Sequence, residues 1–132
     1  MKWSLTQKKV ALSLLVVTLI GFAFKFYSGP GNWWFNNHGA GVLYEIFWIL
    51  LAFLFFSSKR SVNLIPVYVF LITCILEFFQ LWHPPFLEMI RSSFLGSALI
   101  GTTFVWWDFP HYVLGCFMGW IWLRFLLSRE EK

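Results

Sequence analysis

The sequence predicts an all-α integral membrane protein: a four-transmembrane-helix bundle with a short re-entrant or interfacial helix between the third and fourth spans. The chain of 132 residues is 59% hydrophobic and 23% aromatic, but only 12% charged. A water-soluble core of this size cannot bury so much apolar surface, so the lipid of a bilayer must be its solvent. Because no polar linker interrupts the chain, we expect a single membrane domain over residues 1–132.

Four apolar runs are long enough to cross a bilayer, whose core of about 30 Å takes roughly 20 helical residues. They cover residues 10–27, 39–56, 64–82 and 109–127. Backbone groups in lipid must bond within their own segment, so each run is expected to be helical. The basic N-terminus and first run imitate a signal peptide, but Lys25 and Tyr27 stand where a cleavage site of small residues would lie. We expect this helix to be retained.

The segment 86–107, between the third and fourth runs, is the predicted interfacial or re-entrant element. Its apolar part, Phe94 to Trp107, carries no charge and contains Gly96 and Gly101. It is too short to cross the bilayer comfortably, which favours a helix pressed against the bundle over a fifth span.

Basic residues predict the orientation of the chain, since they favour the cytoplasmic side. They gather before the first run, after the second and late in the fourth: Lys2, Lys8, Lys9, Lys59, Arg60, Arg124, Arg129 and Lys132. We therefore expect a multi-pass protein of the plasma membrane with both termini in the cytoplasm. Residues 28–38 and 83–108 would then form outer loops, the first rich in Gly, Pro and Asn, which are typical of turns.

Polar side chains follow the packed faces of three helices near the outer side. Steps of three and four residues return to one helical face, which groups Glu77 with Gln80, and Asp108 with His111 and Tyr112. The small residues Gly41, Gly115 and Gly119 lie on the same faces, and the last two form a GxxxG motif for close helix packing. Ionisable groups at membrane depth are candidate functional residues. The candidate ligand-binding set is Glu77, Gln80, Arg91, Asp108, His111, Glu45, Asn37 and Tyr112.

Three functions fit this set. The first is binding of an amphiphile or cell-envelope component, with Arg91 holding an anionic headgroup. In the second, the chain is an accessory subunit of a larger membrane complex, and Arg91 neutralises the carboxylates of an inert network. The third is an enzyme acting on a lipid-linked substrate, in which Glu77, Asp108 and His111 exchange protons, although no nucleophile or phosphate-loop motif occurs.

Membrane lipids are the expected partners, and neither a metal nor another cofactor is expected. Cys74 and Cys116 both lie within apolar runs, as small hydrophobic side chains do, and no histidine pair lies at mid-membrane depth for a haem. The basic residues sit at helix ends rather than in a patch with aromatics, which argues against nucleic-acid binding.

The strings NNHGAGVLYEIFW and ILEFFQLWHPPFLEMIRSSFLGSALIGTTFVWWDFPHYVLGCFMGW carry a family resemblance. They resemble a family of small bacterial membrane proteins, the domain of unknown function 2809, over most of the chain, and that resemblance implies no activity. More distantly, the order Glu77, Gln80, Arg91, Asp108, Gly115, Gly119 is similar to the pattern of VanZ-like proteins. The early Asp-Lys-x-x-His of that pattern is absent, the Arg to Asp separation is longer, and Tyr112 replaces a usual Asn. What this similarity implies is an outward-facing polar site.

Overall fold

The computed structural model describes residues 4–100 and 106–130, and every regular element in these ranges is a helix. Three helices are long and apolar enough to cross a membrane: α1 (Leu5–Phe26), the stretch Asn32–Phe55 and α4 (Ser61–Phe79). This confirms the prediction of an all-helical fold over the described residues, and three of the helices are candidate membrane spans. A fourth long helix, α7 (Asp108–Glu130), closes the described chain. Its Pro, His and Arg residues make it less apolar than the other three.

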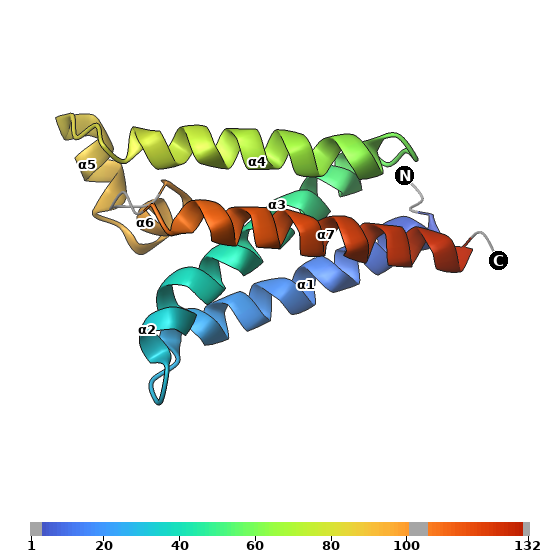
Figure 1. Cartoon of the computed structure of the whole chain (residues 1–132), viewed down its shortest axis with the longest axis horizontal. Coiled ribbons are helices and arrows are strands. Elements are labelled where there is room, and N and C mark those ends of the chain that lie inside the picture. Colours follow the sequence, from blue (N-terminus) through green and yellow to red (C-terminus); the bar gives the residue numbers. More distant parts are fainter. Residues whose placement is uncertain (1–3, 101–105, 131–132) are drawn as a thin grey trace.

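Figure 1 shows the four long helices running between the same two ends of the molecule. The terminal end holds the first turns of α1, the turn 56–60 and the last turns of α7. The loop end holds the connection 27–39, the short helices that follow α4 and the first turn of α7.

Helix α3 (Ala40–Phe55) forms the centre of the bundle and packs against α1, α4 and α7. Its residues Ile46, Ile49 and Leu50 are fully buried, together with Val10 of α1 and Leu123 of α7. A helix that is apolar on all sides is stable only when its surroundings are apolar too, and α3 meets this condition through its three neighbours.

Two glycines of α7 allow it to approach α3 closely. A Cβ atom at Gly115 would lie 2.7 Å from the Cβ of Glu45 and 2.8 Å from the carbonyl oxygen of Val42. At Gly119 it would lie 2.7 Å from Cδ1 of Ile49. This is the geometry of a GxxxG face, in which the missing side chains let two helices touch. On the α3 side, a Cβ at Gly41 would only come into ordinary contact, 3.8 Å from the Tyr112 ring.

The prediction that residues 28–38 form a loop was wrong for most of that range. The turn is confined to a few residues around Gly31, whose φ of 75° is the left-handed conformation that glycine adopts readily. Helix α2 (Asn32–Trp34) then begins and continues through the π-helical turn η1 (Phe35–Gly39) into α3.

The asparagine side chains that suggested a turn in this stretch bind backbone carbonyls instead. Nδ2 of Asn36 donates to the carbonyl oxygens of Phe24 at 2.5 Å and Tyr27 at 3.1 Å. The last carbonyls of a helix have no partner within the helix, so Asn36 satisfies the end of α1. The Gly, Pro and Asn content of this stretch indicated a turn, whereas the side-chain amide of Asn36 binds carbonyl groups at the end of α1.

The predicted segment 86–107 contains two short helices, α5 (Pro85–Arg91) and α6 (Phe94–Ile100), while its residues 101–105 lie outside the described ranges. The ring of Phe94 stacks 5.6 Å from that of Phe26 of α1, and the Tyr44 hydroxyl of α3 donates to the carbonyl of Leu99 at 2.6 Å. Helix α6 therefore packs on the bundle. An interfacial or re-entrant placement in the bilayer stays a prediction.

Candidate functional site

Glu77 lies at the centre of the polar cluster at the loop end. Its side chain, on the last turns of α4, is 0% exposed. The Tyr112 hydroxyl of α7 donates to Oε2 of Glu77 at 2.8 Å, and Nε2 of Gln80 donates to the same oxygen at 3.4 Å. A buried carboxyl group needs such donors because burial removes the water molecules that would otherwise donate hydrogen bonds to it.

Asp108 connects this buried carboxyl group to the outer surface. It is the first residue of α7, where a negative charge is favoured by the helix dipole, and its side chain is 21% exposed. The carboxyl groups of Asp108 and Glu77 lie close enough to influence each other. A carboxylate has no donor, so two carboxyl groups can form a hydrogen bond only when one of them carries a proton. The pair is therefore a candidate proton-holding position between α4 and α7.

Two stacked histidines cover the other side of Asp108. Nδ1 of His38 lies 3.3 Å from Oδ1 of Asp108, and the rings of His38 and His111 stack with centroids 4.3 Å apart and planes 15° from parallel. Nε2 of His111 accepts a hydrogen bond from Nε1 of Trp34 at 3.2 Å, and its Nδ1 lies 2.7 Å from the Trp107 carbonyl oxygen.

These contacts indicate the tautomer of His111. The indole nitrogen of Trp34 can only donate, so Nε2 of His111 accepts, and a carbonyl can only accept, so Nδ1 of His111 donates. Its stacked neighbour His38 is 3% exposed and lies beside the Asp108 carboxyl group. The buried Nδ1 of His38 makes no hydrogen bond, so His38 approaches Asp108 without being bound to it.

Glu45 forms a second buried carboxyl position, on α3 and deeper in the bundle. It is 0% exposed, and the Cys116 thiol of α7 donates to its Oε2 at 2.9 Å. Its Cβ also lies against Gly115, so the small residue of α7 makes room for this glutamate.

Arg91 binds the end of α4. Its guanidinium donates to the carbonyl oxygens of Trp82 at 2.9 Å and Phe79 at 3.1 Å, and to Oε1 of Glu88 at 2.9 Å. Carbonyls at a helix C-terminus attract cations. Oε1 of Glu88 also lies 2.7 Å from Nδ1 of His83. The hydrogen bonds with His83 and Arg91 lower the pKa of the exposed Glu88 carboxyl group. These contacts of Arg91 hold α5 against α4.

Asn37 lies outside the cluster, and its neighbour His38 lies inside. The Asn37 side chain is exposed and donates to the Trp33 carbonyl at 2.7 Å. Gly41 and Glu45 share one helical face by their spacing, and a further step of three residues back from Gly41 reaches His38. This spacing could have identified His38 as a member of the cluster. The turn-like composition of residues 28–38 argued against a helix there, so His38 was missed.

Across residues 4–100 and 106–130, no three His, Cys, Asp or Glu side chains are grouped so that they could hold a metal ion. The two cysteines in this part of the chain are free thiols.

Residues 31–116 match the family described as "Protein of unknown function (DUF2809)", which is more than half of the chain. The chain belongs to this family. No curated protein and no solved structure matches it. The more distant similarity to VanZ-like proteins stays a prediction.

The DUF2809 match covers the whole polar cluster, from His38 on η1 and Glu45 on α3 to Tyr112 and Cys116 on α7. The second half of α7, with Trp120 and Arg124, lies beyond it. The part of the chain that matches the family is thus the part that carries the buried carboxyl groups and the stacked histidines.

Proposed function

We propose that this DUF2809 protein crosses the bacterial inner membrane four times, with α7 as the fourth span and both ends of the chain in the cytoplasm. The distribution of charge supports this orientation. The terminal end carries Lys8, Lys9, Lys59, Arg60 and Arg124, whereas Lys25 and Arg91 lie at the loop end. Basic residues favour the cytoplasmic side, which puts the loop end and its polar cluster outside.

Reporter fusions test this topology. Alkaline phosphatase folds only outside the cytoplasm, so a fusion after Ser93 is expected to be active and a fusion after Lys59 inactive. Activity of the Lys59 fusion contradicts the orientation, and equal activity of both contradicts the number of spans between them.

At the loop end, the polar cluster acts as an acid–base site that binds an amphiphile or cell-envelope component. The observation that carries this proposal is the proximity of two carboxyl groups, Glu77 and Asp108, one fully buried and the other partly exposed. General acid–base chemistry uses a pair of titratable groups held in different environments, and this pair meets that condition. His38 beside Asp108 offers a third proton-exchanging group.

An aromatic rim explains why the ligand is amphiphilic. Five exposed tryptophans lie around the loop end in the described part of the chain, namely Trp33, Trp34, Trp82, Trp106 and Trp107. Tryptophans at a membrane surface present an apolar body to lipid and a polar edge to water. A ligand with an apolar tail can lie against this rim while its polar group reaches Asp108.

The substitution Asp108→Asn tests the site, because it keeps the size of the side chain and removes its titration. Wild-type protein purified in mild detergent is expected to carry an envelope amphiphile that native mass spectrometry detects. Occupancy is expected to fall by about tenfold in Asp108→Asn, the effect of one lost charge-assisted contact. Glu88→Gln, which removes an exposed carboxyl group at the same end, is the matched control and should retain the ligand.

The competing functions give other results. Equal amphiphile occupancy in Asp108→Asn and wild type overturns the proposal. An accessory subunit would co-purify with a protein in place of an amphiphile, in every variant. An enzyme would convert the bound amphiphile, so that a chemically altered form accumulates with the wild type and not with Asp108→Asn.

A further inference from the structure

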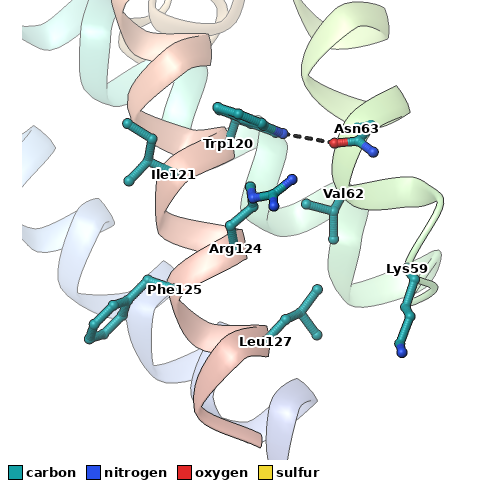
Figure 2. Close-up of a pocket in the computed structure, with 8 residues that line it drawn as sticks. All are labelled: Lys59, Val62, Asn63, Trp120, Ile121, Arg124, Phe125 and Leu127. Atoms are coloured by element: carbon teal, nitrogen blue, oxygen red, sulfur yellow. Dashed lines mark hydrogen bonds between the residues drawn. The ribbon is translucent and has the colours of Figure 1, made fainter. Parts of the chain in front are cut away.

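A groove with a different chemistry lies at the terminal end, between the first turns of α4 and the last turns of α7. Its volume is about 560 Å³. Figure 2 shows Trp120, Arg124 and Leu127 on the α7 side, and Val62 and Asn63 on the α4 side, with Lys59 at the mouth. None of this set belongs to the polar cluster at the loop end.

The floor of the groove orients a cation. Nε1 of Trp120 donates to Oδ1 of Asn63 at 2.9 Å, which connects α7 to α4. The guanidinium carbon of Arg124 lies 5.1 Å from the centre of the Trp120 ring, in a cation–π contact. Such a contact uses the face of the guanidinium and leaves the N–H groups at its edge to donate. These N–H groups form a planar fork that matches a phosphate.

The charge of the groove selects an anion. Among the residues whose side chains the structure describes, its lining includes the cations Lys59 and Arg124 and no Asp or Glu. Arg60, beside the groove, and Lys8 and Lys9, in the first turns of α1, add positive charge at the same end. Positive charge beside a membrane attracts anionic headgroups, by about fivefold in affinity for each Lys or Arg.

The apolar walls select a lipid over a soluble anion. Val62 and Leu127 face each other across the groove (Figure 2), and Ile121 and Phe125 continue an exposed apolar surface along the outer flank of α7. A phosphate ion makes no use of such walls, whereas an acyl chain gains free energy with each methylene group that it buries. We propose that the groove binds one anionic phospholipid of the adjacent leaflet. Its phosphate lies on Arg124 and Lys59, between Val62 and Leu127, and its acyl chains run from there toward the bilayer along Ile121 and Phe125.

Native mass spectrometry of the full chain in nonionic detergent tests this proposal, with phosphatidylglycerol and phosphatidylcholine of equal acyl chains as probes. Wild type is expected to bind phosphatidylglycerol at least about fivefold more tightly, the effect of one headgroup contact. Arg124→Gln should reduce this preference by about fivefold, and Arg60→Gln by less than about twofold, because Arg60 carries the same charge outside the groove.

A second variant separates the groove from its charge. Val62→Trp fills the space and keeps both cations, so it is expected to abolish the bound phosphatidylglycerol as well. Retention of the lipid by Val62→Trp overturns the proposal, and so does an equal loss in Arg124→Gln and Arg60→Gln, which indicates diffuse surface charge. If inorganic phosphate at millimolar concentration displaces phosphatidylglycerol from wild type, the groove is a soluble-anion site and the lipid assignment is wrong. If Arg124→Gln does not fold, Lys59→Gln replaces it with the same expected loss.

Discussion

The two ends of the bundle place their charged groups in opposite ways. At the loop end Glu45 and Glu77 are fully buried and His38 is nearly so, whereas at the terminal end Lys59 and Arg124 are exposed. Removing an ionised group from water costs several kcal/mol unless it is paired or neutralised, so buried groups must bind each other. Long Lys and Arg side chains avoid this cost, because their charged ends reach water while their stems cover apolar surface.

Mutations at the two ends are therefore expected to change different properties of the protein. The loop-end cluster joins α3, α4 and α7 through bonds between buried groups, so changes there alter the stability of the bundle together with its chemistry. The terminal-end groove displays its charges toward the membrane surface, so changes there alter what binds and leave the fold intact. The following predictions test the contrast in order of expected effect.

The largest effect is expected for Gly115→Ala, compared with Gly119→Ala. The new Cβ at position 115 meets the backbone carbonyl of Val42 and the Cβ of Glu45, neither of which can rotate away, while at position 119 it meets the flexible tip of Ile49. We expect Gly115→Ala to lower the free energy of unfolding by about 3 kcal/mol, and Gly119→Ala to lower it by less than about 1 kcal/mol. Thermal unfolding of both variants in one detergent measures the difference, and equal melting temperatures contradict it.

A smaller effect follows from removing one hydrogen bond at each end. Tyr112→Phe removes the donor to buried Glu77, and Asn63→Ala removes the acceptor of Trp120 at the exposed groove. We expect a loss of about 1.5 kcal/mol for Tyr112→Phe, because a buried carboxyl oxygen loses the closer of its two donors and keeps only Gln80, and less than about 0.5 kcal/mol for Asn63→Ala, because water replaces the amide. Chemical denaturation in detergent measures the free energy of unfolding of both variants. A larger loss in Asn63→Ala than in Tyr112→Phe would show that the two ends do not differ in this way.

The apolar runs of the sequence predicted most of the fold, and helix periodicity predicted part of the cluster. The runs 10–27, 39–56 and 64–82 each overlap one candidate membrane-spanning helix, because a helix in lipid needs an unbroken apolar run. The first two helices begin earlier than predicted, at Leu5 and Asn32, because polar residues extend them beyond the apolar run. The Glu77 and Gln80 pair was readable for a similar reason, since spacing by three residues fixes a shared helical face.

Helix periodicity could not predict the contacts between helices. The bond from Tyr112 to Glu77 and the stack of His38 on His111 depend on how α3, α4 and α7 are rotated against one another, which no single helix encodes. The segment 28–38 failed for a different reason. Its composition is typical of a turn, but the turn is short, and Asn36 binds the end of α1 from within a helix.

The smallest effect concerns Glu88, an exposed carboxyl group at the loop end that contrasts with buried Glu77. Hydrogen bonds with His83 and Arg91 lower its pKa from the usual value of 4.5. A carboxyl group with a lowered pKa in the folded state stabilises the fold fully above the unfolded-state pKa, and this contribution is lost as the pH falls through the lower folded value. Wild type and Glu88→Gln should therefore differ in melting temperature by a small, constant amount well above pH 4.5, and the difference should shrink as the pH falls below 4.5 and through the lower folded-state pKa. Salt should shrink it as well, because the group is exposed and screened. A difference that grows toward acid pH would mean that the contact between Glu88 and Arg91 does not hold α5 in the way its geometry indicates.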